Sequence, residues 1–272
     1  MRCCTRRESV DVLPQVRQRG GVPAGRCHLI AAGFTPGTAP SGVCTDASAN
    51  RAKVEGVSAG IDQEKRASAL AAAALVESGM VLGLGTGTTV AFLVPALVER
   101  HLDVTSVATS PATQSVACAA GLRVVPFEGI DRLDLAIDGS DQVDPQGWLI
   151  KGGGGAHTRE KIVAAAADRF VVIVSSNKVV DRLRPPVPLE LLAFGLDVVR
   201  RVIPGIELRQ APLTPDGGVL ADYHGEVDDP ERLSALFDAT PGVVAHGLFP
   251  PTMVSAVLIG RGDQVEERQI IG

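Results

Sequence analysis

Groups that can move protons are concentrated in one 23-residue stretch near the middle of the chain. Asp138 and Asp141 come first, Lys151 opens a run of four glycines, and Glu160 follows it. Four consecutive glycines cost backbone entropy, so a fold keeps them where a partner must approach the main chain closely or where φ must be positive. Acids and a lysine on either side of such a loop indicate proton transfer on a small polar substrate.

Each of these residues also has a plainer interpretation. An aspartate after a strand is most often a helix cap or a turn former, and Glu160 is equally compatible with a solvated helix position. The grouping of these residues favours chemistry, because Asp138 and Asp141 follow a predicted strand and α/β sheets bind their ligands at that end. His157 is interpreted as a residue that starts a helix rather than as a catalyst.

A second motif, Gly83-Leu-Gly-Thr-Gly-Thr-Thr89, follows a predicted strand and opens a helix. Backbone N–H groups at a helix N-terminus bind anions, and the threonine hydroxyls add donors. The last glycine of a dinucleotide fingerprint and the lysine of a triphosphate loop are missing. A single phosphate monoester therefore fits best, and the alternative is a merely tight turn. Lys178, which follows another strand end, and Lys65 on the first helix are possible charged partners of that phosphate.

The elements around these motifs alternate between strand and helix. Helices are predicted at 62–78, from 89 to about 100, from 110 to 120 and at about 157–167. Strands are predicted at 80–84, 104–109, 122–126, 133–137 and 170–174. This alternation predicts an α/β fold with a Rossmann-like parallel sheet flanked by helices.

The texture of the sequence changes after Pro185-Pro186. Residues 187–247 combine short strands with two helices, near 191–203 and 229–238, whereas 254–260 is apolar enough to return to the main sheet. We therefore expect a catalytic domain formed by 61–186 with 253–272. A smaller α+β lid domain, 187–252, is expected to be inserted near the C-terminus.

Composition excludes several classes of function. The net charge is −5 with no basic cluster, which argues against nucleic acid as a partner. No apolar run approaches the ~20 residues that span a bilayer, so no membrane partner is expected. Neither the five cysteines nor any His/Cys/Asp cluster has the spacing of a metal site or a disulfide framework. A reduced cytoplasmic compartment is the simplest expectation.

Residues 1–60 differ from the rest of the chain. They contain scattered Gly and Pro and no periodic pattern, so we expect a disordered extension or an upstream start on a shorter protein. The segment lacks the apolar stretch of a secretory signal. An organelle transit peptide is the alternative, because the segment is rich in arginine, but Glu8 and Asp11 weaken that interpretation.

The chain resembles the type A ribose-5-phosphate isomerases over about residues 62–265. The resemblance rests on the following stretches: Gly85-Thr-Gly-Thr-Thr89, Ala136-Ile-Asp-Gly-Ser-Asp-Gln-Val-Asp144, Leu149-Ile-Lys-Gly-Gly-Gly-Gly-Ala156, Arg159-Glu-Lys-Ile-Val163, Pro241-Gly-Val-Val244 and Gly247-Leu-Phe249. It implies conversion of D-ribose 5-phosphate to D-ribulose 5-phosphate through an enediol or enediolate, in the non-oxidative pentose phosphate pathway. It also implies a pentose phosphate as the small-molecule partner and a homodimer or homotetramer.

Carried over by position, the resemblance makes Glu160 the base that moves a proton between C1 and C2. Asp138, Asp141 and Lys151 then surround the sugar oxygens. The implied substrate-binding residues are Thr86, Gly87, Thr88, Thr89, Gly139, Ser140, Gly152, Gly153, Gly154, Lys178 and, as a weaker candidate, Lys65. The reaction needs one base that reaches both carbons and donors for the developing oxyanion, with no redox cofactor and no metal.

Three positions depart from the family pattern. Gln142 stands where glutamate is usual, Ser140 replaces a common alanine, and Ser176-Asn177 precedes Lys178 where an acidic residue and serine are usual. Two rival functions remain open. One is a sugar-phosphate sensor without catalysis, which would need an output module. The other is a different enzyme on a related fold, such as a deaminase with a histidine dyad or an acyl-CoA transferase.

Overall fold

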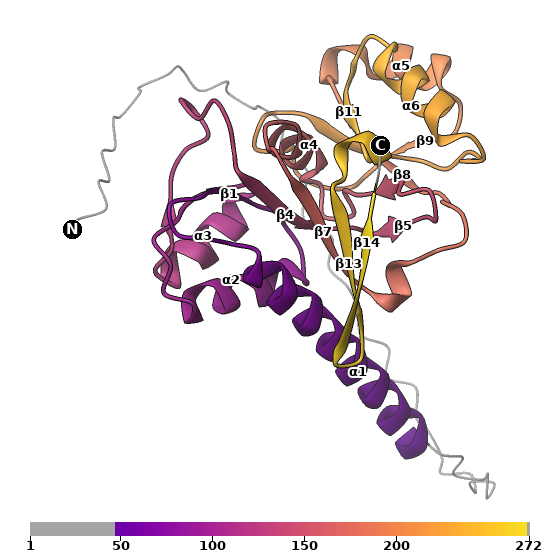
Figure 1. Ribbon diagram of the computed structural model, residues 1–272. Helices are drawn as coiled ribbons and strands as arrows, with labels where there is room; N and C mark the ends of the chain where they lie inside the picture. The colour runs from indigo at the N-terminus through magenta and orange to yellow at the C-terminus, as the bar shows by residue number, and fades with distance from the viewer. Residues whose placement is uncertain (1–46, 271–272) are drawn as a thin grey trace, which may run out of the picture. The chain divides into compact units, whose positions relative to one another are not determined.

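The centre of the structure is a seven-stranded sheet, shown with its flanking helices in Figure 1. The computed structural model describes residues 47–270. The sheet has the order β14-β13-β7-β4-β1-β2-β3, and its strands are β1 (Val81–Leu84), β2 (Thr105–Ala108), β3 (Arg123–Val124), β4 (Leu135–Gly139), β7 (Phe170–Ser175), β13 (Ala256–Arg261) and β14 (Gln264–Gln269). All neighbouring strands are parallel except β13 and β14. The predicted parallel sheet, including the return of the chain to it after residue 254, is confirmed.

The strand order locates the functional end of this sheet. Counted along the chain, the six parallel strands lie in the order 3-2-1-4-5-6, the doubly wound arrangement. The direction of winding reverses between β1 and β4, and ligands of such sheets bind beyond the carboxyl ends of the strands at this point. The turn 85–89 and Asp138 therefore meet at the switch point of the sheet.

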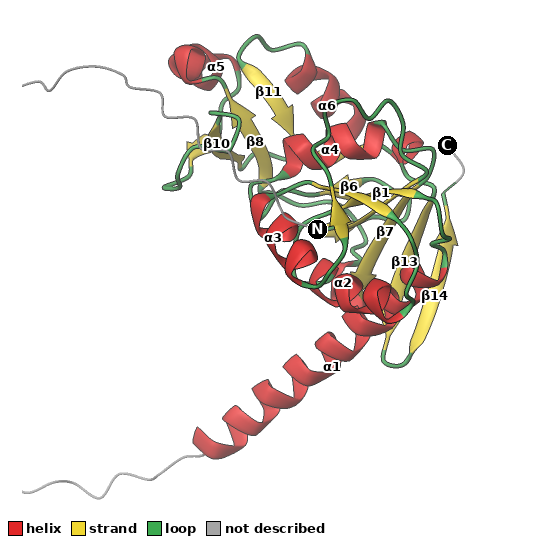
Figure 2. Ribbon diagram, turned by 90° about the vertical axis from the view of Figure 1, so that its left-hand side faces the viewer, coloured by secondary structure: helices red, strands yellow, loops and turns green. Residues whose placement is uncertain are grey.

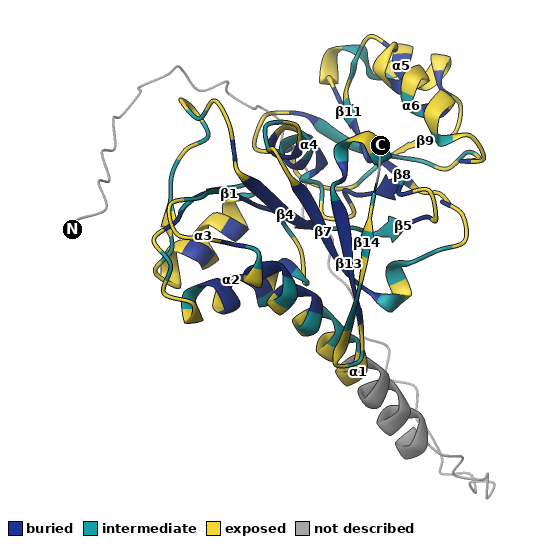
Figure 3. Ribbon diagram, viewed as in Figure 1, coloured by how far each residue is buried: buried dark blue, intermediate teal, exposed yellow. Residues whose placement is uncertain are grey.

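Helices cover both faces of the sheet, as Figure 2 shows. α1 (Ala47–Ala74), α2 (Val90–Glu99) and α3 (Pro111–Ala119) lie on one face, and α4 (His157–Ala165) lies on the other. Side chains alternate along each strand, so Leu135 and Ile137 join the first core while Ala136 joins the second. Of the central strands, β7 is buried along its whole length and β1 and β4 along most of theirs, as Figure 3 shows.

The first helix begins earlier than the sequence predicts. We expected it to start at Asp62, whereas α1 begins at Ala47. The prediction was wrong because Gly56 and Gly60 interrupt the pattern with residues that disfavour helices. Part of the extension expected at 1–60 is therefore helical, and residues 1–46 lie outside the described part of the chain.

A four-stranded antiparallel sheet forms the core of a second unit, residues 187–246, which we call the smaller unit. Its order is β11-β8-β10-β9, with elements β8 (Val187–Leu191), α5 (Leu196–Val202), β9 (Ile206–Leu208), β10 (Val219–Tyr223), α6 (Pro230–Asp238) and β11 (Val243–His246). Both helices predicted in this region are present. The smaller unit has its own core, in which Phe237 and Leu189 are fully buried.

Several short elements were not predicted. A three-stranded sheet joins β5 (Gln142–Val143), β6 (Leu149–Ile150) and β12 (Leu248–Phe249), and the 3-10 turns are η1 (Ser176–Lys178), η2 (Ala193–Gly195) and η3 (Pro251–Met253). The edge strand β14 was also missed, because its charged sequence resembles a solvated tail and its pairing with β13 depends on the hairpin. No helix described between residues 47 and 270 is long and apolar enough to cross a membrane.

Candidate active site

A cavity of about 110 Å³ opens at the switch point of the sheet. Its lining comes from four segments: 86–89, 139–141, 151–154 with Glu160, and Lys178. These segments hold every predicted site residue except Asp138, which lies beneath the cavity floor, and Lys65. No residue of the smaller unit lines this cavity, so its role as a lid stays a prediction.

Three charged groups meet under the cavity. The ammonium of Lys151 lies 2.9 Å from Asp138 Oδ2 and 3.1 Å from Glu160 Oε2, and it donates a hydrogen bond to the carbonyl of Gly139 at 2.5 Å. The side chains of Lys151, Asp138 and Glu160 are only 2%, 5% and 6% exposed. An isolated charge buried this deeply would be costly, so each of the three charged groups depends on its oppositely charged neighbour.

Burial changes the acidity of all three groups. The pKa of Glu160 is raised to about 7, first because the carboxyl is buried and then because Asp138 lies nearby, against the opposing effect of Lys151. Burial also raises the pKa of Asp138. Burial alone would lower the pKa of Lys151, but the two carboxylates outweigh burial and raise that pKa, so the lysine stays charged. A carboxylate poised near neutrality is the form in which a general base works best.

Asp138 also connects the turn after β1 to the end of β4. Its Oδ1 accepts hydrogen bonds from the N–H groups of Thr86 at 3.0 Å and Gly139 at 2.7 Å. A side chain at position 85 could not coexist with this arrangement, since a Cβ on Gly85 would lie 1.9 Å from the Asp138 carboxyl. Because Gly85 has no side chain, the Asp138 carboxyl can occupy this position.

The glycine run forms a tight loop over the triad. Gly152 and Gly155 have φ of 102° and 74°, values that favour glycine. Asp141 Oδ2 accepts from the N–H of Gly153 at 2.8 Å and so holds the loop from the side of the main sheet. His157, the first residue of α4, packs under Gly152, and burial lowers its pKa to about 3. It is neutral and outside the cavity lining, in agreement with its interpretation as a helix-start residue.

The turn 85–89 leaves donors free at the N-terminus of α2. Among the described residues, the backbone N–H groups of 87–90 donate to no protein atom. The Thr86 hydroxyl is engaged with that of Thr109 at 2.8 Å, which fixes the turn against β2. Lys178 lines the cavity from η1, and the Glu64 carboxylate anchors this 3-10 turn by accepting from the Ser176 N–H at 2.9 Å.

Lys65 does not join this group. Its ammonium pairs with Asp62 at 3.0 Å on α1, and the residue does not line the cavity. Of the two lysines that were predicted as charged partners of a phosphate, Lys178 lines the cavity and Lys65 does not.

Two of the three departures from the family pattern have a structural account. The Gln142 side chain donates to the carbonyl of Arg184 and accepts from its N–H, both at 2.8 Å, a pairing that only an amide completes in both directions. The Ser140 hydroxyl donates to the carbonyls of Gln142 at 2.7 Å and Ile150 at 2.9 Å. Neither substitution removes a charge from the triad.

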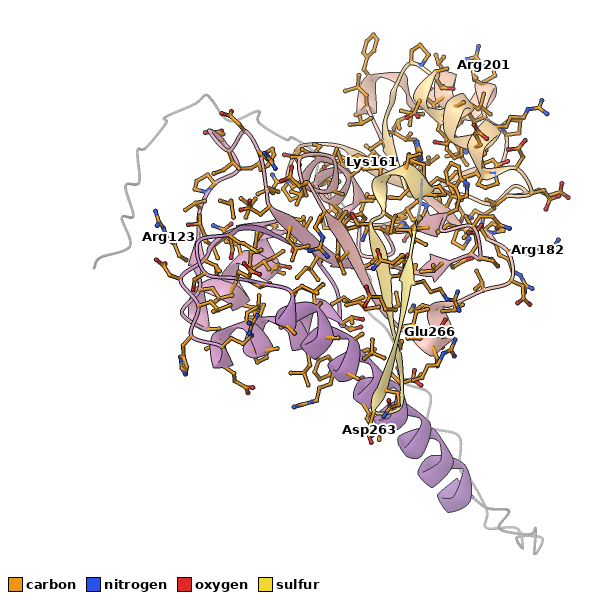
Figure 4. The ribbon with its side chains drawn as sticks, viewed as in Figure 1. Arg123, Lys161, Arg182, Arg201, Asp263 and Glu266 are labelled. Atoms are coloured by element: carbon orange, nitrogen blue, oxygen red, sulfur yellow. The ribbon has the colours of Figure 1, made fainter. Side chains whose placement is uncertain are left out.

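Sequence reasoning missed three residues that support the site. Arg209 of the smaller unit contacts the glycine loop, and Asp222 holds its guanidinium. The buried ring of Phe249 lies between two ammonium groups, 5.5 Å from Lys151 Nζ and 5.0 Å from Lys161 Nζ. Figure 4 labels Lys161 on α4, near the smaller unit. Of these three residues, only Phe249 could have been found from the sequence, because it lies in the motif Gly247-Leu-Phe249.

The charged groups under the cavity are two carboxylates and one ammonium, which are suited to acid–base chemistry. In the described range, 47–270, no three His, Cys, Asp or Glu side chains are grouped so that they could hold a metal ion. The fold and the site together define an α/β protein with a buried carboxylate–lysine–carboxylate group beside a free helix N-terminus.

Comparison with known families is consistent with that class. The family model of ribose 5-phosphate isomerase A (phosphoriboisomerase A) matches residues 105–264. The chain is 43% identical over 215 residues to ribose-5-phosphate isomerase A of Methanosarcina acetivorans, covering 74% of this chain and 91% of that protein. The corresponding protein of Roseiflexus sp. is 45% identical over 208 residues, with 70% and 89% covered. The chain belongs to the ribose-5-phosphate isomerase A family, whose members are aldose–ketose isomerases.

Solved structures agree with this assignment. Ribose 5-phosphate isomerase A from Neisseria gonorrhoeae superposes with a TM-score of 0.74 at 31% identity, covering 78% of this chain and 98% of that one. A D-ribose-5-phosphate isomerase in complex with phospho-erythronic acid gives a TM-score of 0.73 at 30% identity, with 77% and 99% covered. The Rossmann-like fold predicted from the sequence is thus the fold of this family.

Proposed function

We propose that this chain catalyses the reversible conversion of D-ribose 5-phosphate to D-ribulose 5-phosphate. The observation that carries the proposal is Glu160, a buried carboxylate with a pKa raised to about 7 by burial, which faces the same small cavity as residues 87–89 with their free N–H groups. One wall of the cavity therefore offers a base and the other offers an anion site. A phosphorylated sugar that spans both would place its carbonyl end at the base.

In this proposal Glu160 takes the proton from C2 of the open-chain aldehyde. The electron pair of that C–H bond forms the C1–C2 double bond, and the former carbonyl oxygen on C1 becomes the enediolate oxygen. The Lys151 ammonium and the backbone N–H groups of the glycine loop stabilise this charge. After a proton has moved from the C2 hydroxyl to the C1 oxygen, Glu160 returns its proton to C1 and the ketose is formed.

The remaining residues hold the substrate or the catalytic groups. The free N–H groups of 87–90 and the Lys178 ammonium bind the phosphate. Asp138 keeps Lys151 charged and oriented, and Asp141 lies where sugar hydroxyls would reach it. None of these contacts needs a cofactor.

The test is to incubate the purified protein with ribose 5-phosphate and EDTA and to follow ketose formation. Turnover is expected, whereas no ketose from an otherwise folded protein would refute the proposal. Glu160→Gln keeps the size of the side chain and removes the base, so turnover should fall by at least ~10²-fold with KM nearly unchanged. A variant that kept more than about a tenth of the parent turnover would show that Glu160 is not the base.

Phospho-erythronic acid, the ligand of one structural relative, provides a second probe. It joins a phosphate to a carboxylate, and the carboxylate resembles the two oxygens of the enediolate. We expect it to inhibit this chain competitively. Inhibition by inorganic phosphate alone should be weaker, because phosphate occupies only the anion corner.

We further propose that the protein is a homo-oligomer formed through the smaller unit. The segment from Leu192 to Val202 carries four exposed apolar side chains, of which Phe194 is 97% exposed. Phe194, Val198 and Val202 follow a spacing of four residues along η2 and α5, which gives one apolar stripe. A symmetric pair of such stripes would cover each other.

We also propose that the reaction takes place in the cytoplasm. Cys118, the cysteine that the described residues contain, is an exposed free thiol, the state expected in a reducing compartment. Cell fractionation of the tagged protein tests this, and recovery in another compartment would refute it.

A further inference from the structure

The smaller unit reaches the glycine loop through one side chain. Arg209 follows β9, and its guanidinium forms a two-pronged pair with Asp222 on β10, Nε to Oδ2 at 2.8 Å and Nη2 to Oδ1 at 2.6 Å. The remaining nitrogen, Nη1, donates to the carbonyls of Gly152 at 3.0 Å and Gly153 at 3.2 Å. Every nitrogen of the guanidinium is thus engaged, and both partner side chains are less than a fifth exposed.

These two contacts fix the orientation of two consecutive peptide groups. In a trans peptide the N–H points away from the C=O of the same group. Because Arg209 holds the carbonyl of Gly153, the N–H of Gly154 points in the opposite direction. Gly154 lines the cavity, and its N–H donates to no protein atom in the described structure.

The neighbouring peptide group is held from both sides. Its carbonyl, that of Gly152, accepts from Arg209, while its N–H, that of Gly153, donates to Asp141 at 2.8 Å. Asp141 follows β4 of the main sheet and Arg209 follows β9 of the smaller unit, so this peptide group is held between them. A cation on the carbonyl also polarises the peptide group, which makes its N–H a stronger donor.

We propose that Arg209 is a positioning residue that turns the Gly154 N–H into the cavity as a donor to the reacting oxygen. The proposal rests on the isomerase function proposed above. Asp222 in turn positions the guanidinium. The smaller unit therefore contributes by fixing the direction of the Gly154 N–H through the carbonyl of Gly153. This role does not require the smaller unit to close over the cavity.

Lysine could not replace Arg209 in this geometry. The planar fork of arginine binds a carboxylate with two nitrogens and still offers a third, fixed in the same plane, to the loop. A lysine ammonium is a single point charge, and pairing with Asp222 would draw it away from the carbonyls. Arg209→Lys should therefore recover little of the activity that Arg209→Met loses.

The chain offers a matched control in Arg159. Its guanidinium makes the same two-pronged pair, with Asp216 at 2.6 and 2.7 Å, and it also joins the main domain to the smaller unit. It contacts no carbonyl of the glycine loop. Arg159→Met thus removes an ion pair of the same two-pronged geometry, in a more exposed position, without touching the loop.

The experiment compares kcat and KM for ribose 5-phosphate in the parent, Arg209→Met and Arg159→Met. Removing one oxyanion donor costs about 10²–10³-fold in kcat, so misdirecting it should cost roughly 10- to 100-fold. KM should change by less than about threefold in Arg209→Met, because the phosphate contacts are untouched. Both parameters of Arg159→Met should stay within about threefold of the parent.

Inhibition separates positioning from general damage. Phospho-erythronic acid, whose carboxylate would accept from the Gly154 N–H, should bind Arg209→Met more weakly by about the factor lost in kcat/KM. Inorganic phosphate should inhibit the parent and the variant equally. Equal weakening of both inhibitors would overturn the proposal, since it would mean that the whole site has collapsed.

Amide hydrogen exchange gives a readout that does not depend on turnover. Peptides that contain residues 151–155 should exchange faster in Arg209→Met, while those of β4 and β7 keep the rates of the parent. Unchanged exchange in the loop together with unchanged kcat would refute the role of Arg209. A parent protein without isomerase activity would instead refute the proposed function, and faster loop exchange would still show that Arg209 holds the loop.

Discussion

At the scale of single residues, the site depends on one lysine placed between two carboxylates. Lys151 lies within 3.1 Å of both Asp138 and Glu160, and all three are buried. One ammonium cannot neutralise two carboxylates, so the triad retains an excess negative charge when fully ionised. Burial first, and then this excess negative charge, favour the protonated form of Glu160, so its pKa is raised above that of an exposed glutamate.

This raised pKa predicts the pH dependence of the reaction. A base must be deprotonated to act, so kcat/KM should rise with pH and reach half its plateau near the Glu160 pKa of about 7. Below that value the rate should fall about tenfold per pH unit. An ordinary glutamate would keep full activity down to roughly pH 5.

The substrate phosphate also titrates, with a pKa near 6, so the assignment needs a direct control. Carbon NMR of labelled glutamate side chains in the free enzyme follows the carboxyl itself, and the resonance lost in Glu160→Gln identifies it. A Glu160 resonance that titrates near pH 4 would contradict the prediction.

Lys178 provides a second prediction at this scale. Lys178→Ala removes a charge-assisted contact worth ~1.5–3 kcal/mol, so KM for ribose 5-phosphate should rise by roughly one to two orders of magnitude. Unphosphorylated ribose lacks the group being held, and its slow reaction should hardly change. Equal losses on both substrates would show that Lys178 serves the sugar or the fold rather than the phosphate.

At the scale of elements, the turn after β1 and the end of β4 depend on each other. The N–H of Gly85 donates to the carbonyl of Ile137 at 2.9 Å, and that of Thr86 to Asp138 at 3.0 Å. The two strands approach this closely because position 85 has no side chain. The turn 85–89 and the end of β4 are therefore held together by these two hydrogen bonds.

Gly85→Ala tests this dependence. The added methyl would lie 1.9 Å from the Asp138 carboxyl, so the aspartate must move away from Lys151. We expect a loss of ~1–3 kcal/mol in the free energy of unfolding, as for other overpacked sites. We also expect at least ~10²-fold loss in kcat/KM, because the displaced carboxylate no longer orients Lys151.

Gly60→Ala is the matched control for this substitution. It places the same methyl on α1 with nothing within 4 Å, and it should stabilise the helix by up to ~1 kcal/mol without changing kcat. Denaturant melts and steady-state kinetics of both variants measure the contrast. Parent-like kinetics in Gly85→Ala would mean that the two elements are not coupled.

At the scale of the whole molecule, the described part of the chain divides its work between two units. Every residue of the cavity lining lies outside the smaller unit, and the smaller unit contacts the glycine loop through Arg209. The apolar stripe of Phe194, Val198 and Val202 is the surface that we propose for association.

Phe194→Asp tests association at this scale. If the stripe joins two copies, the variant should sediment as a monomer at protein concentrations at which the parent is an oligomer. Leu213→Asp is the control, because Leu213 is an exposed apolar residue of the smaller unit outside the segment 192–202. A Phe194→Asp protein that sediments like the parent would exclude the stripe as the interface.

The sequence by itself determined the features that local patterns encode. Strand and helix alternation indicated the parallel sheet, and the motifs indicated the turn 85–89, the glycine loop and the set Asp138, Lys151 and Glu160. Each depends on residues close together in the chain, where periodicity, capping and glycine placement decide the backbone. The start of α1 escaped this reasoning because Gly56 and Gly60 interrupt its N-terminal half.

Only the tertiary structure decided how distant segments complete the site. Arg209 meets Gly152 across 57 positions of sequence, and the carbonyl of Gly247 accepts from the N–H of Lys151 across a still longer separation. It also decided that Lys65 pairs with Asp62, away from the cavity. Such contacts depend on how the two cores pack against each other, and no local pattern records which side chain will then face which carbonyl.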